Sequence, residues 1–257
     1  MPEGDTLHRT ADGLRPHLVG RTVTAARARA GGAQAERVVG STVEAVEAVG
    51  KNLLLRFDNG LEIRTHLRMN GSWHRYRPGE PWRRPASRAR LVLEVPGAVA
   101  VCFDAPVVEL FEARSEAIHP TLGRLGPDLL APDFDPAEAV QRLRADTRLE
   151  APIAEAIVDQ RALSGIGNIC KSEALFAEGV APFALVRELD DATLTRVVQR
   201  ARELLLRSAA RGGRQRHQVY GRAGRPCPRC GSLIASRQHG ELARTTYWCP
   251  SCQVTNA

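Results

Sequence analysis

The cysteine spacing in the last part of the chain constrains the fold more than any other feature. Two CxxC pairs are separated by 18 residues, and they consist of Cys227, Cys230, Cys249 and Cys252. Each pair sets two thiolates on one tight turn, and two such turns complete the closed tetrahedral ligand set that structural Zn²⁺ prefers. The spacing therefore predicts one structural zinc ion per chain, and His239 between the pairs is not needed as a ligand. A pair of disulfides is the weaker alternative, because the sequence begins without a recognisable secretory signal.

The charge of the chain favours a polyanionic partner. The net charge is +7, and residues 211–225 contain five arginines and no carboxylate. A basic segment joined to a zinc module is typical of nucleic-acid binding, although a solvated arginine-rich surface is the alternative. No apolar run is long enough to span a bilayer, so we expect no membrane partner and a cytoplasmic location.

Lysine is nearly absent from the chain. Among 36 basic residues only Lys51 and Lys171 are lysine. Arginine does not release its proton in proteins, whereas lysine can act as an acid, a base or a nucleophile. Lys51 follows a glycine at the start of an apolar run and is a candidate for chemistry, whereas we expect Lys171 on a helix surface.

The hydrophobic periodicity indicates a β-rich first half and a helical second half. Apolar residues at helical spacing predict a leading helix over residues 5–18. The predicted strands cover residues 53–57, 61–67, 91–95, 99–103 and 107–111, with hairpin turns at Asn59-Gly60 and Pro96-Gly97. The predicted helices of the second half cover residues 137–145, 152–159, 171–178 and 191–210. This order predicts an α+β protein whose first part is a β-sandwich or barrel.

The first residues, Met1-Pro2-Glu3-Gly4, suggest an N-terminal nucleophile. A small second residue permits removal of Met1, which exposes the secondary amine of Pro2. An α-amino group titrates near 7.7–8.0 and lysine near 10.4, so at neutral pH the terminal amine is roughly 400 times more often in its nucleophilic form. Such an amine can form a Schiff base, and the carboxylate of Glu3 can move protons beside it.

A glycine-rich turn joins two of the predicted helices. It reads Ser164-Gly165-Ile166-Gly167-Asn168, in which glycines permit close backbone approach. An amide side chain at the N-terminus of a helix suits a phosphate contact. A tight interhelical turn with no ligand is the alternative.

Together these motifs resemble the formamidopyrimidine-DNA glycosylase/endonuclease VIII family of bifunctional base-excision repair enzymes. The resemblance covers nearly the whole chain. Its motifs, in order, are Pro2-Glu3-Gly4, Gly50-Lys51, Leu125-Gly126-Pro127-Asp128, Asp159-Gln160 before the glycine turn, and Arg244 shortly before Cys249. The glycine after Pro2-Glu3 and the run Tyr247-Trp248-Cys249-Pro250 look more like the endonuclease VIII branch.

The resemblance implies an N-terminal β-sandwich with a leading helix, a helix–two-turn–helix domain and a C-terminal zinc finger. On this basis we expect a catalytic domain over residues 1–118, a linker over 119–135, the helical DNA-binding domain over 136–219 and the zinc finger over 220–257. A lesion-reading loop is expected in or near residues 207–219.

The resemblance also implies roles for individual residues. Pro2 would attack C1′ of the damaged nucleotide to expel the base and form an imine, and Glu3 would transfer protons around the opening sugar. Lys51 would contact phosphate and assist base loss and β-elimination. Asn168, Arg124 and Arg244 would contact backbone phosphates, and Arg244 would also assist δ-elimination. The loop of Arg68, Met69 and Asn70 is where a wedge that inserts between bases is expected. For Met69, a place in the core is the alternative.

The resulting hypothesis is a monomeric, nucleoid-associated DNA glycosylase and abasic-site lyase. It would bind damaged DNA, duplex or single-stranded, remove oxidised bases (pyrimidines above all) and nick the strand by β,δ-elimination. One departure is Thr6, where the family usually carries a second glutamate, with Asp5 adjacent. A noncatalytic damaged-DNA-binding protein of the same fold is therefore the alternative. A zinc-ribbon transcription regulator would leave Pro2 and Lys51 without a purpose.

Overall fold

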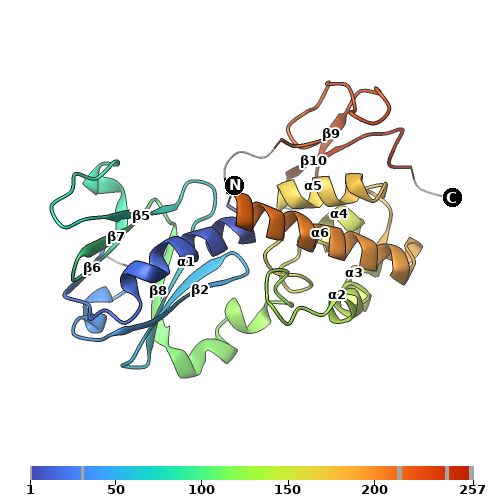
Figure 1. Cartoon of the computed structure of the whole chain (residues 1–257). Coiled ribbons are helices and arrows are strands. Elements are labelled where there is room, and N and C mark those ends of the chain that lie inside the picture. Colours follow the sequence, from blue (N-terminus) through green and yellow to red (C-terminus); the bar gives the residue numbers. More distant parts are fainter. Residues whose placement is uncertain (1, 30–31, 213–215, 241–242, 255–257) are drawn as a thin grey trace. The chain divides into compact units, whose positions relative to one another are not determined.

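The computed structural model of the chain describes residues 2–29, 32–212, 216–240 and 243–254. It divides into two compact units, residues 1–124 and residues 125–257 (Figure 1). Each unit has its own hydrophobic core, and each is described by itself below. Across the described ranges, no helix is both long enough and apolar enough to cross a membrane.

The first unit begins with the predicted helix, α1 (Gly4–Leu18). Its buried apolar side chains recur at helical spacing, with Leu7, Leu14 and Leu18 on one face. This face packs against the sandwich, and the guanidinium of Arg15 donates to the carbonyl of Val46 (Nη2–O 3.0 Å). This hydrogen bond attaches the last turns of the helix to the strand that contains Val46.

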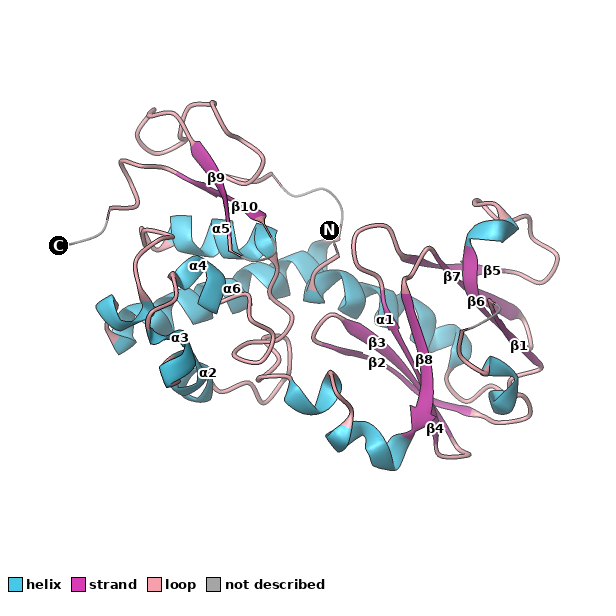
Figure 2. Ribbon diagram, turned by 180° about the vertical axis from the view of Figure 1, so that it is seen from behind, coloured by secondary structure: helices cyan, strands magenta, loops and turns pink. Residues whose placement is uncertain are grey.

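Two antiparallel four-stranded sheets form the body of the first unit (Figure 2). The first sheet has the order β2-β3-β4-β8, with β2 (Val43–Val49), β3 (Asn52–Phe57), β4 (Leu61–His66) and β8 (Val107–Glu112). The second has the order β1-β6-β7-β5, with β1 (Ala25–Ala28), β6 (Ala89–Val95), β7 (Ala98–Phe103) and β5 (Ser72–Tyr76). Buried residues of both sheets, such as Leu55 and Leu93, share one core with α1. The predicted β-sandwich with a leading helix is confirmed.

The two predicted hairpin turns are present. Asn59-Gly60 joins β3 to β4 and Pro96-Gly97 joins β6 to β7. Both glycines have positive φ (76° and 83°), a region that a side chain disfavours. The local turn chemistry therefore sets these two connections.

Three strands of the sandwich were absent from the sequence prediction. β1 reads Ala-Ala-Arg-Ala, and alanine and arginine carry little strand preference of their own. β2 has a glutamate at every third position instead of the alternation expected of a strand, and β5 is mostly polar. All three are held by pairing with a neighbouring strand, which is information that lies elsewhere in the chain.

The second unit contains a helical core and a short β-hairpin. The helices are α2 (Pro136–Leu143), α3 (Asp146–Leu149), α4 (Ile153–Ala156), α5 (Asn168–Ala177) and α6 (Asp191–Arg211). Buried residues such as Leu175 and Val197 join α5 and α6 in one cluster. The hairpin consists of β9 (Ala235–His239) and β10 (Arg244–Trp248). Short 3₁₀ turns across the two units are η1 (Ala35–Val38), η2 (Ala86–Arg88), η3 (Ala113–Ile118), η4 (Leu122–Arg124) and η5 (Val186–Glu188).

Candidate functional site

Three segments of the first unit meet at one end of its sandwich. Asn52 at the start of β3 pairs with His66 at the end of β4, so the β2–β3 turn lies beside the loop that follows β4. The end of α1 is joined to the start of β2, because Gly20 N–H donates to the carbonyl of Val43 (2.9 Å). The start of α1 therefore lies at the same end as the β2–β3 turn, as Figures 1 and 2 show. The segments are residues 2–3, 50–51 and 67–71.

The first of these segments holds a buried carboxylate beside Pro2. Glu3 is only 4 % exposed, although glutamate is rarely buried in proteins. It precedes α1 in an extended conformation, and its carbonyl accepts from the N–H groups of Thr6 (3.0 Å) and Leu7 (3.3 Å). Two backbone hydrogen bonds therefore set the position of this residue next to the half-buried Pro2.

The carboxylate nearest to the unusual Thr6 is already engaged. Asp5 is buried and forms an ion pair with Arg9, one helical turn further on (2.9 Å). The hydroxyl of Thr6 also lies 3.4 Å from Asp5 Oδ1. The positive charge of Arg9 therefore offsets the negative charge of the Asp5 carboxylate.

Lys51 lies at the tip of a two-residue hairpin turn. Val49 pairs with Asn52, which leaves Gly50 and Lys51 as the central residues. Gly50 has a φ of 59°, so its lack of a side chain allows the turn. The amide of Asn52 donates to the carbonyl of Val49 (3.0 Å) and accepts from Arg64 Nε (2.9 Å). The turn that presents the half-buried Lys51 is therefore braced from within the sheet.

The predicted wedge loop is an exposed, tightly closed turn. Gly71 N–H donates to the carbonyl of Leu67 (2.9 Å), and a Cβ on Gly71 would lie 2.6 Å from that oxygen. Only glycine fits there. Arg68 has a φ of 46°, which is uncommon for a residue with a side chain. Met69 is 64 % exposed, so it is not a core methionine. Its insertion into DNA stays a prediction.

His66 supports this loop, and the sequence analysis missed it. Its Nδ1 accepts a hydrogen bond from Arg68 N–H (3.3 Å). Burial, together with the positive charges of Arg64, Lys51 and Arg68, lowers the pKa of His66 to about 4. The imidazole is therefore neutral near pH 7 and can accept the bond. The signal available in the sequence was its place between an apolar strand and the exposed loop.

Replacing His66 by asparagine is expected to weaken the pH dependence of stability between about pH 6.5 and pH 4. The pKa of His66 is about 4 in the folded protein against 6.5 ordinarily, so in this window only the unfolded chain takes up the proton. The folded state consequently loses up to about 3 kcal/mol as the pH falls from 6.5 to 4. Denaturant unfolding of both proteins at pH 7 and pH 4.5 measures this difference. An identical fall in both would contradict the assignment.

In the second unit, Gln160 shapes the glycine turn before α5. Its Nε2 donates to the carbonyl of Ile166 (3.1 Å), and its Oε1 accepts from Gly165 N–H (3.2 Å). Gly165 has a φ of 91°, which a side chain would disfavour. The side chain of Gln160 thereby closes the turn that delivers Asn168 to the first position of α5.

Asn168 is joined to the β-hairpin instead of facing solvent. Its Nδ2 donates to the carbonyl of Thr245 in β10 (2.7 Å), and the residue is 8 % exposed. Its Oδ1 is buried and has no partner among the described residues. The contact places the start of α5 beside the strand that begins with Arg244, so two predicted phosphate grips share one neighbourhood. Their contact with phosphate stays a prediction.

The expectation for Lys171 is wrong. Its side chain has no exposed surface, and its Nζ donates to the hydroxyl of Thr246 in β10 (2.6 Å). The residue lies in the part of α5 that packs against the hairpin, where β10 covers it. The sequence pattern of α5 alone did not contain this information, because the burial comes from a strand some 75 residues later.

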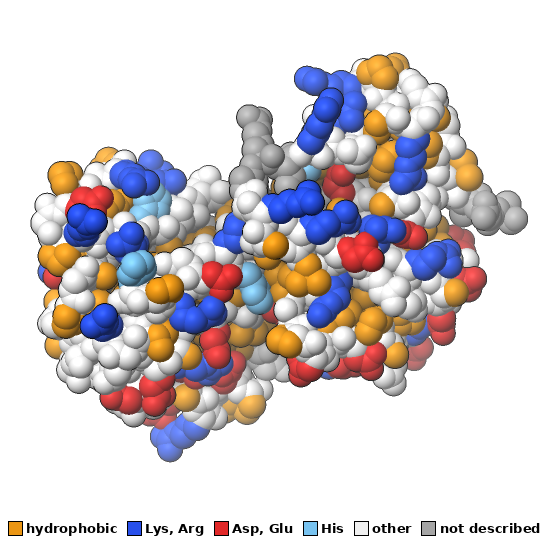
Figure 3. All heavy atoms as spheres, viewed as in Figure 1, with side chains coloured by type: hydrophobic (Ala, Val, Ile, Leu, Met, Phe, Trp, Pro, Cys, Tyr) orange, Lys and Arg blue, Asp and Glu red, His pale blue; other side chains and the backbone are white. Residues whose placement is uncertain are grey.

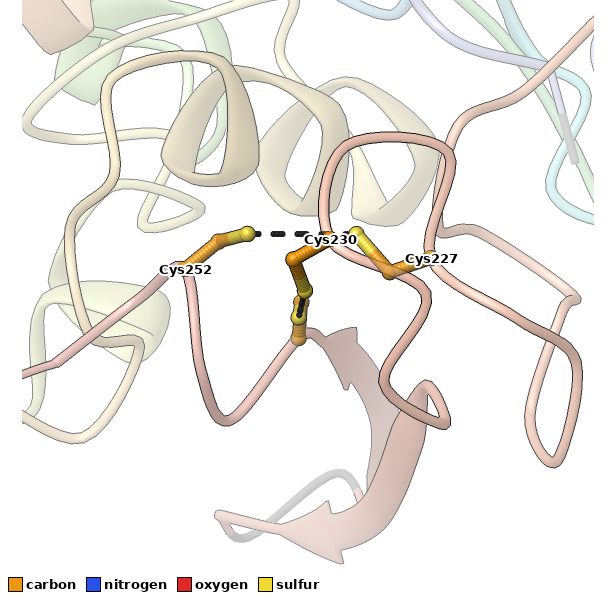
Figure 4. Close-up of side chains that lie close together, drawn as sticks. Cys227, Cys230 and Cys252 are labelled. Carbon is orange, nitrogen blue, oxygen red and sulfur yellow. Dashed lines mark hydrogen bonds between the residues drawn. The ribbon is translucent and has the colours of Figure 1, made fainter.

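The four cysteines form one compact cluster (Figure 4). Their sulfur atoms lie within 4.8 Å of one another, with 3.5 Å between Cys230 and Cys249 and 3.9 Å between Cys227 and Cys252. A disulfide requires about 2.05 Å, whereas tetrahedral zinc with bonds of about 2.3 Å sets sulfurs roughly 3.8 Å apart. The donor set and its spacing thus fit zinc, and the disulfide alternative does not fit.

The thiols of this cluster differ in acidity. Hydrogen bonds with Ser232, and further ones with Cys252 and Cys249, lower the pKa of Cys230 to about 6. A hydrogen bond with Cys230, together with burial, raises the pKa of Cys252 to about 12. Binding of a dication would displace the remaining protons. His239 is not a member of the cluster, because its ring contacts Glu155 and Thr246.

Two further predicted features lie away from these contacts. Arg124 is an exposed residue at the end of η4, the last residue of the first unit. The predicted lesion-reading segment, residues 207–219, includes residues 213–215, which lie outside the described residues. After this gap, the Glu173 carboxylate accepts from the backbone N–H groups of Gln218, Val219 and Tyr220 (2.8–2.9 Å). The segment is therefore anchored to α5 where it ends.

Basic side chains also gather along α6, on the face of the second unit seen in Figure 3. Part of this charge is balanced, because Arg196 and Arg200 both pair with Glu178. Arg200 and Arg207 share Glu203 in the same way. The paired arginines make this face a weaker candidate for a polyanion than the segments above.

Comparison with protein families gives two matches that together cover most of the chain. Residues 1–106 match the formamidopyrimidine-DNA glycosylase N-terminal domain. Residues 125–219 match the formamidopyrimidine-DNA glycosylase H2TH domain. The second match spans the glycine turn and Asn168, and the first spans Pro2, Glu3 and Lys51.

Individual relatives match over nearly their whole length. A probable endonuclease 8 2 from Streptomyces coelicolor is 41 % identical over 99 % of this chain and 94 % of its own. The DNA-(apurinic or apyrimidinic site) lyase Nei2 of Mycolicibacterium smegmatis is 38 % identical over 100 % of both chains. Among solved structures, the MutM (Fpg) protein of Thermus thermophilus has a TM-score of 0.84 at 28 % identity, over 98 % of both chains. Lactococcus lactis formamidopyrimidine-DNA glycosylase, non-covalently bound to DNA containing an abasic site, has a TM-score of 0.84 at 21 % identity, over 98 % of this chain and 99 % of its own.

Proposed function

This chain belongs to the formamidopyrimidine-DNA glycosylase family, and we propose that it is a bifunctional base-excision-repair enzyme. It binds damaged DNA, removes an oxidised base and cuts the strand at the resulting abasic site. The names of the relatives from Streptomyces and Mycolicibacterium support the lyase and endonuclease 8 assignments. The observation that carries the proposal is that the start of α1, preceded by the buried Glu3, and the β2–β3 turn that holds Lys51 lie at the same end of the sandwich.

Pro2 supplies the nucleophile once Met1 has been removed. Its secondary amine attacks C1′ of the damaged nucleotide, the bond from C1′ to the base breaks, and the base leaves with the bonding electrons. Glu3 accepts the amine proton and returns a proton to the sugar oxygen as the ring opens, which leaves an imine between Pro2 and the sugar. Lys51 holds the adjacent phosphate and assists the elimination that cuts the strand.

The remaining residues hold the DNA around an extruded nucleotide. A base within a duplex is inaccessible, and flipping it out costs a few kcal/mol. Phosphate contacts by Arg124, Asn168 and Arg244 offset this cost, and insertion of Met69 into the vacated stack supports the flipped state. Arg244 also assists δ-elimination. Oxidised pyrimidines are the proposed substrates. At position 6 this chain has threonine where the family usually has a second glutamate.

We further propose that Zn²⁺ is the ion of the cysteine cluster. Cys227, Cys230, Cys249 and Cys252 would hold it with a closed shell of four thiolates, so the ion is structural and supplies no Lewis-acid step. Two of the four belong to the turn that follows β10, which means that the metal stabilises the hairpin carrying Arg244.

A nicking assay on a duplex with one abasic site tests the proposed function. The enzyme should convert the labelled strand to a product with phosphates at both ends of the gap, which is the product of β,δ-elimination. A protein that shifts the mobility of this duplex without cutting it would be a damaged-DNA-binding protein, and the enzymatic proposal would be wrong.

Replacing Arg244 by alanine should weaken DNA binding and reduce its salt dependence. Each lost phosphate contact lowers the slope of log Kd against log salt by about 1. The matched control is Arg142→Ala, which removes one positive charge from the same unit at a surface pair with Glu138. Fluorescence anisotropy from 50 to 200 mM salt (about the range in which such effects are large) measures both slopes. Equal slopes for the two variants would count against the contact.

A further inference from the structure

Lys171 is a buried cation in a chain that otherwise uses arginine. It is one of only two lysines among 36 basic residues, and its side chain is fully enclosed between α5 and β10. Enclosing a charged amine costs free energy unless hydrogen bonds and an opposite charge compensate it. Because it has no exposed surface, Lys171 does not touch a DNA phosphate itself. Its contacts therefore indicate what it does.

A chain of hydrogen bonds runs from Lys171 through the hairpin to α4. Nζ donates to Thr246 Oγ1 (2.6 Å), Thr246 Oγ1 contacts His239 Nε2, and His239 Nδ1 lies 2.9 Å from Glu155 Oε1. The Thr246 hydroxyl accepts from Lys171 Nζ, and His239 Nδ1 can donate to the Glu155 carboxylate. The chain thus begins at a cation and ends at a carboxylate.

This chain lies on the strand face that carries Arg244. Side chains alternate along a strand, so Arg244 and Thr246 share one face of β10. Arg244 also lies directly opposite His239 in the hairpin register. The neighbouring carbonyl, that of Thr245, accepts from Asn168. His239 and Thr246, which contact each other, therefore flank Arg244. His239 lies across the hairpin and Thr246 lies two residues along the strand.

Packing around His239 leaves the hairpin little freedom. The Phe183 ring packs edge-on against both His239 (5.2 Å between centroids) and Trp248 (5.0 Å). The guanidinium of Arg237 covers the same phenyl ring at 3.8 Å. At the start of the hairpin turn, a Cβ on Gly240 would lie 3.1 Å from the Glu155 carboxylate, so α4 closely approaches the turn. Because the hairpin packs closely against the helices, a change at Lys171 is expected to alter the position of the hairpin.

We infer that Lys171 is a positioning residue that, through Thr246 and His239, sets the place of Arg244 for phosphate binding and δ-elimination. This inference rests on the proposed function, because it assigns Lys171 to the same phosphate grip. Lys171 thereby connects the first turns of α5, where Asn168 lies, to the strand that begins with Arg244.

The test compares Lys171→Met with Arg244→Ala and with the double variant. Methionine keeps the length of the side chain and removes its charge and donors. We expect Lys171→Met to weaken DNA binding by about tenfold, the loss for one charge-assisted hydrogen bond. It should also shift the nicked product from β,δ- toward β-elimination, as Arg244→Ala does. The double variant should bind DNA as tightly as Arg244→Ala alone and give the same products, because both residues act through one phosphate contact.

A second pair of variants keeps the test decisive if Lys171→Met folds poorly. Thr246→Ser retains the hydroxyl and should keep the wild-type ratio of products, whereas Thr246→Val removes it and should behave like Lys171→Met. Bound zinc and far-UV circular dichroism identify variants that have lost the fold.

The outcomes separate the two proposals. If Arg244→Ala leaves binding and products unchanged, the phosphate grip of the proposed function is wrong. If Arg244→Ala has its effect but Thr246→Val matches Thr246→Ser in both measurements, the positioning role is overturned. Losses for Lys171→Met and Arg244→Ala that add in the double variant would overturn it as well, because they would show independent sites.

Discussion

Substitution of Cys249 by serine is expected to abolish tight DNA binding and strand cleavage and to release the metal. Cys249 has no exposed surface, and its sulfur lies 3.5 Å from that of Cys230. Structural zinc contributes on the order of 10 kcal/mol or more to the fold of a small module. This free energy exceeds the one gained by burying the small apolar cluster of Phe176, Val219 and Ile234. Without the metal, the hairpin with Arg244 should therefore lose its structure.

Metal content by atomic emission, hairpin proteolysis and DNA anisotropy measure these effects together. Cys102→Ala is the matched control, since Cys102 is a buried cysteine of β7 outside the cluster. It should keep its zinc and its DNA affinity. A Cys249→Ser protein that binds DNA as tightly as the control would mean that the hairpin does not depend on the metal.

Replacement of Glu3 by glutamine should lower the rate of base removal by about 100- to 10,000-fold, the usual contribution of a general acid–base group. The change removes the charge and keeps the shape of a side chain that is 4 % exposed. The backbone carbonyl of Glu3 would still accept from Thr6 and Leu7, so α1 should begin at the same residue. DNA affinity is expected to change little, because Glu3 makes none of the proposed phosphate contacts.

Single-turnover cleavage of a duplex with an oxidised pyrimidine measures this rate. Asp12→Asn serves as the control, because Asp12 is an exposed carboxylate of α1 paired with Arg15. It should cleave at the wild-type rate. Full activity of Glu3→Gln together with a loss in Asp5→Asn would move the proton-transfer role to Asp5, despite its pairing with Arg9.

The features that sequence predicted are those with a local cause. Glycine turns such as Asn59-Gly60, the apolar face of α1 and the spacing of the cysteine pairs each depend on a few neighbouring residues. The assignment of Glu3 as a buried group beside Pro2 needed the fold, although the resemblance already named it. Strand β1 escaped prediction, because only its pairing with β6 makes its alanines a strand.

The features that sequence missed depend on contacts between distant segments. Lys171 reads as a surface residue within its own helix, and β10 buries it. The sequence suggested a phosphate contact for Asn168 but not the hydrogen bond from its side-chain amide to the Thr245 carbonyl. His66 gave no signal beyond its place before the wedge loop, and its lowered pKa comes from burial and three surrounding cations. The scarcity of lysine was the one hint of an unusual role for Lys171.

The most direct test of the account is to identify the residue that becomes bonded to DNA. The protein is incubated with an abasic-site duplex in the presence of sodium borohydride, which reduces an imine to a stable amine, and the digested adduct is sequenced by mass spectrometry. We expect the modified peptide to begin at Pro2 and to carry the sugar on its terminal nitrogen. An adduct on Lys51 or Lys171, or strand cleavage without any trapped adduct, would contradict it.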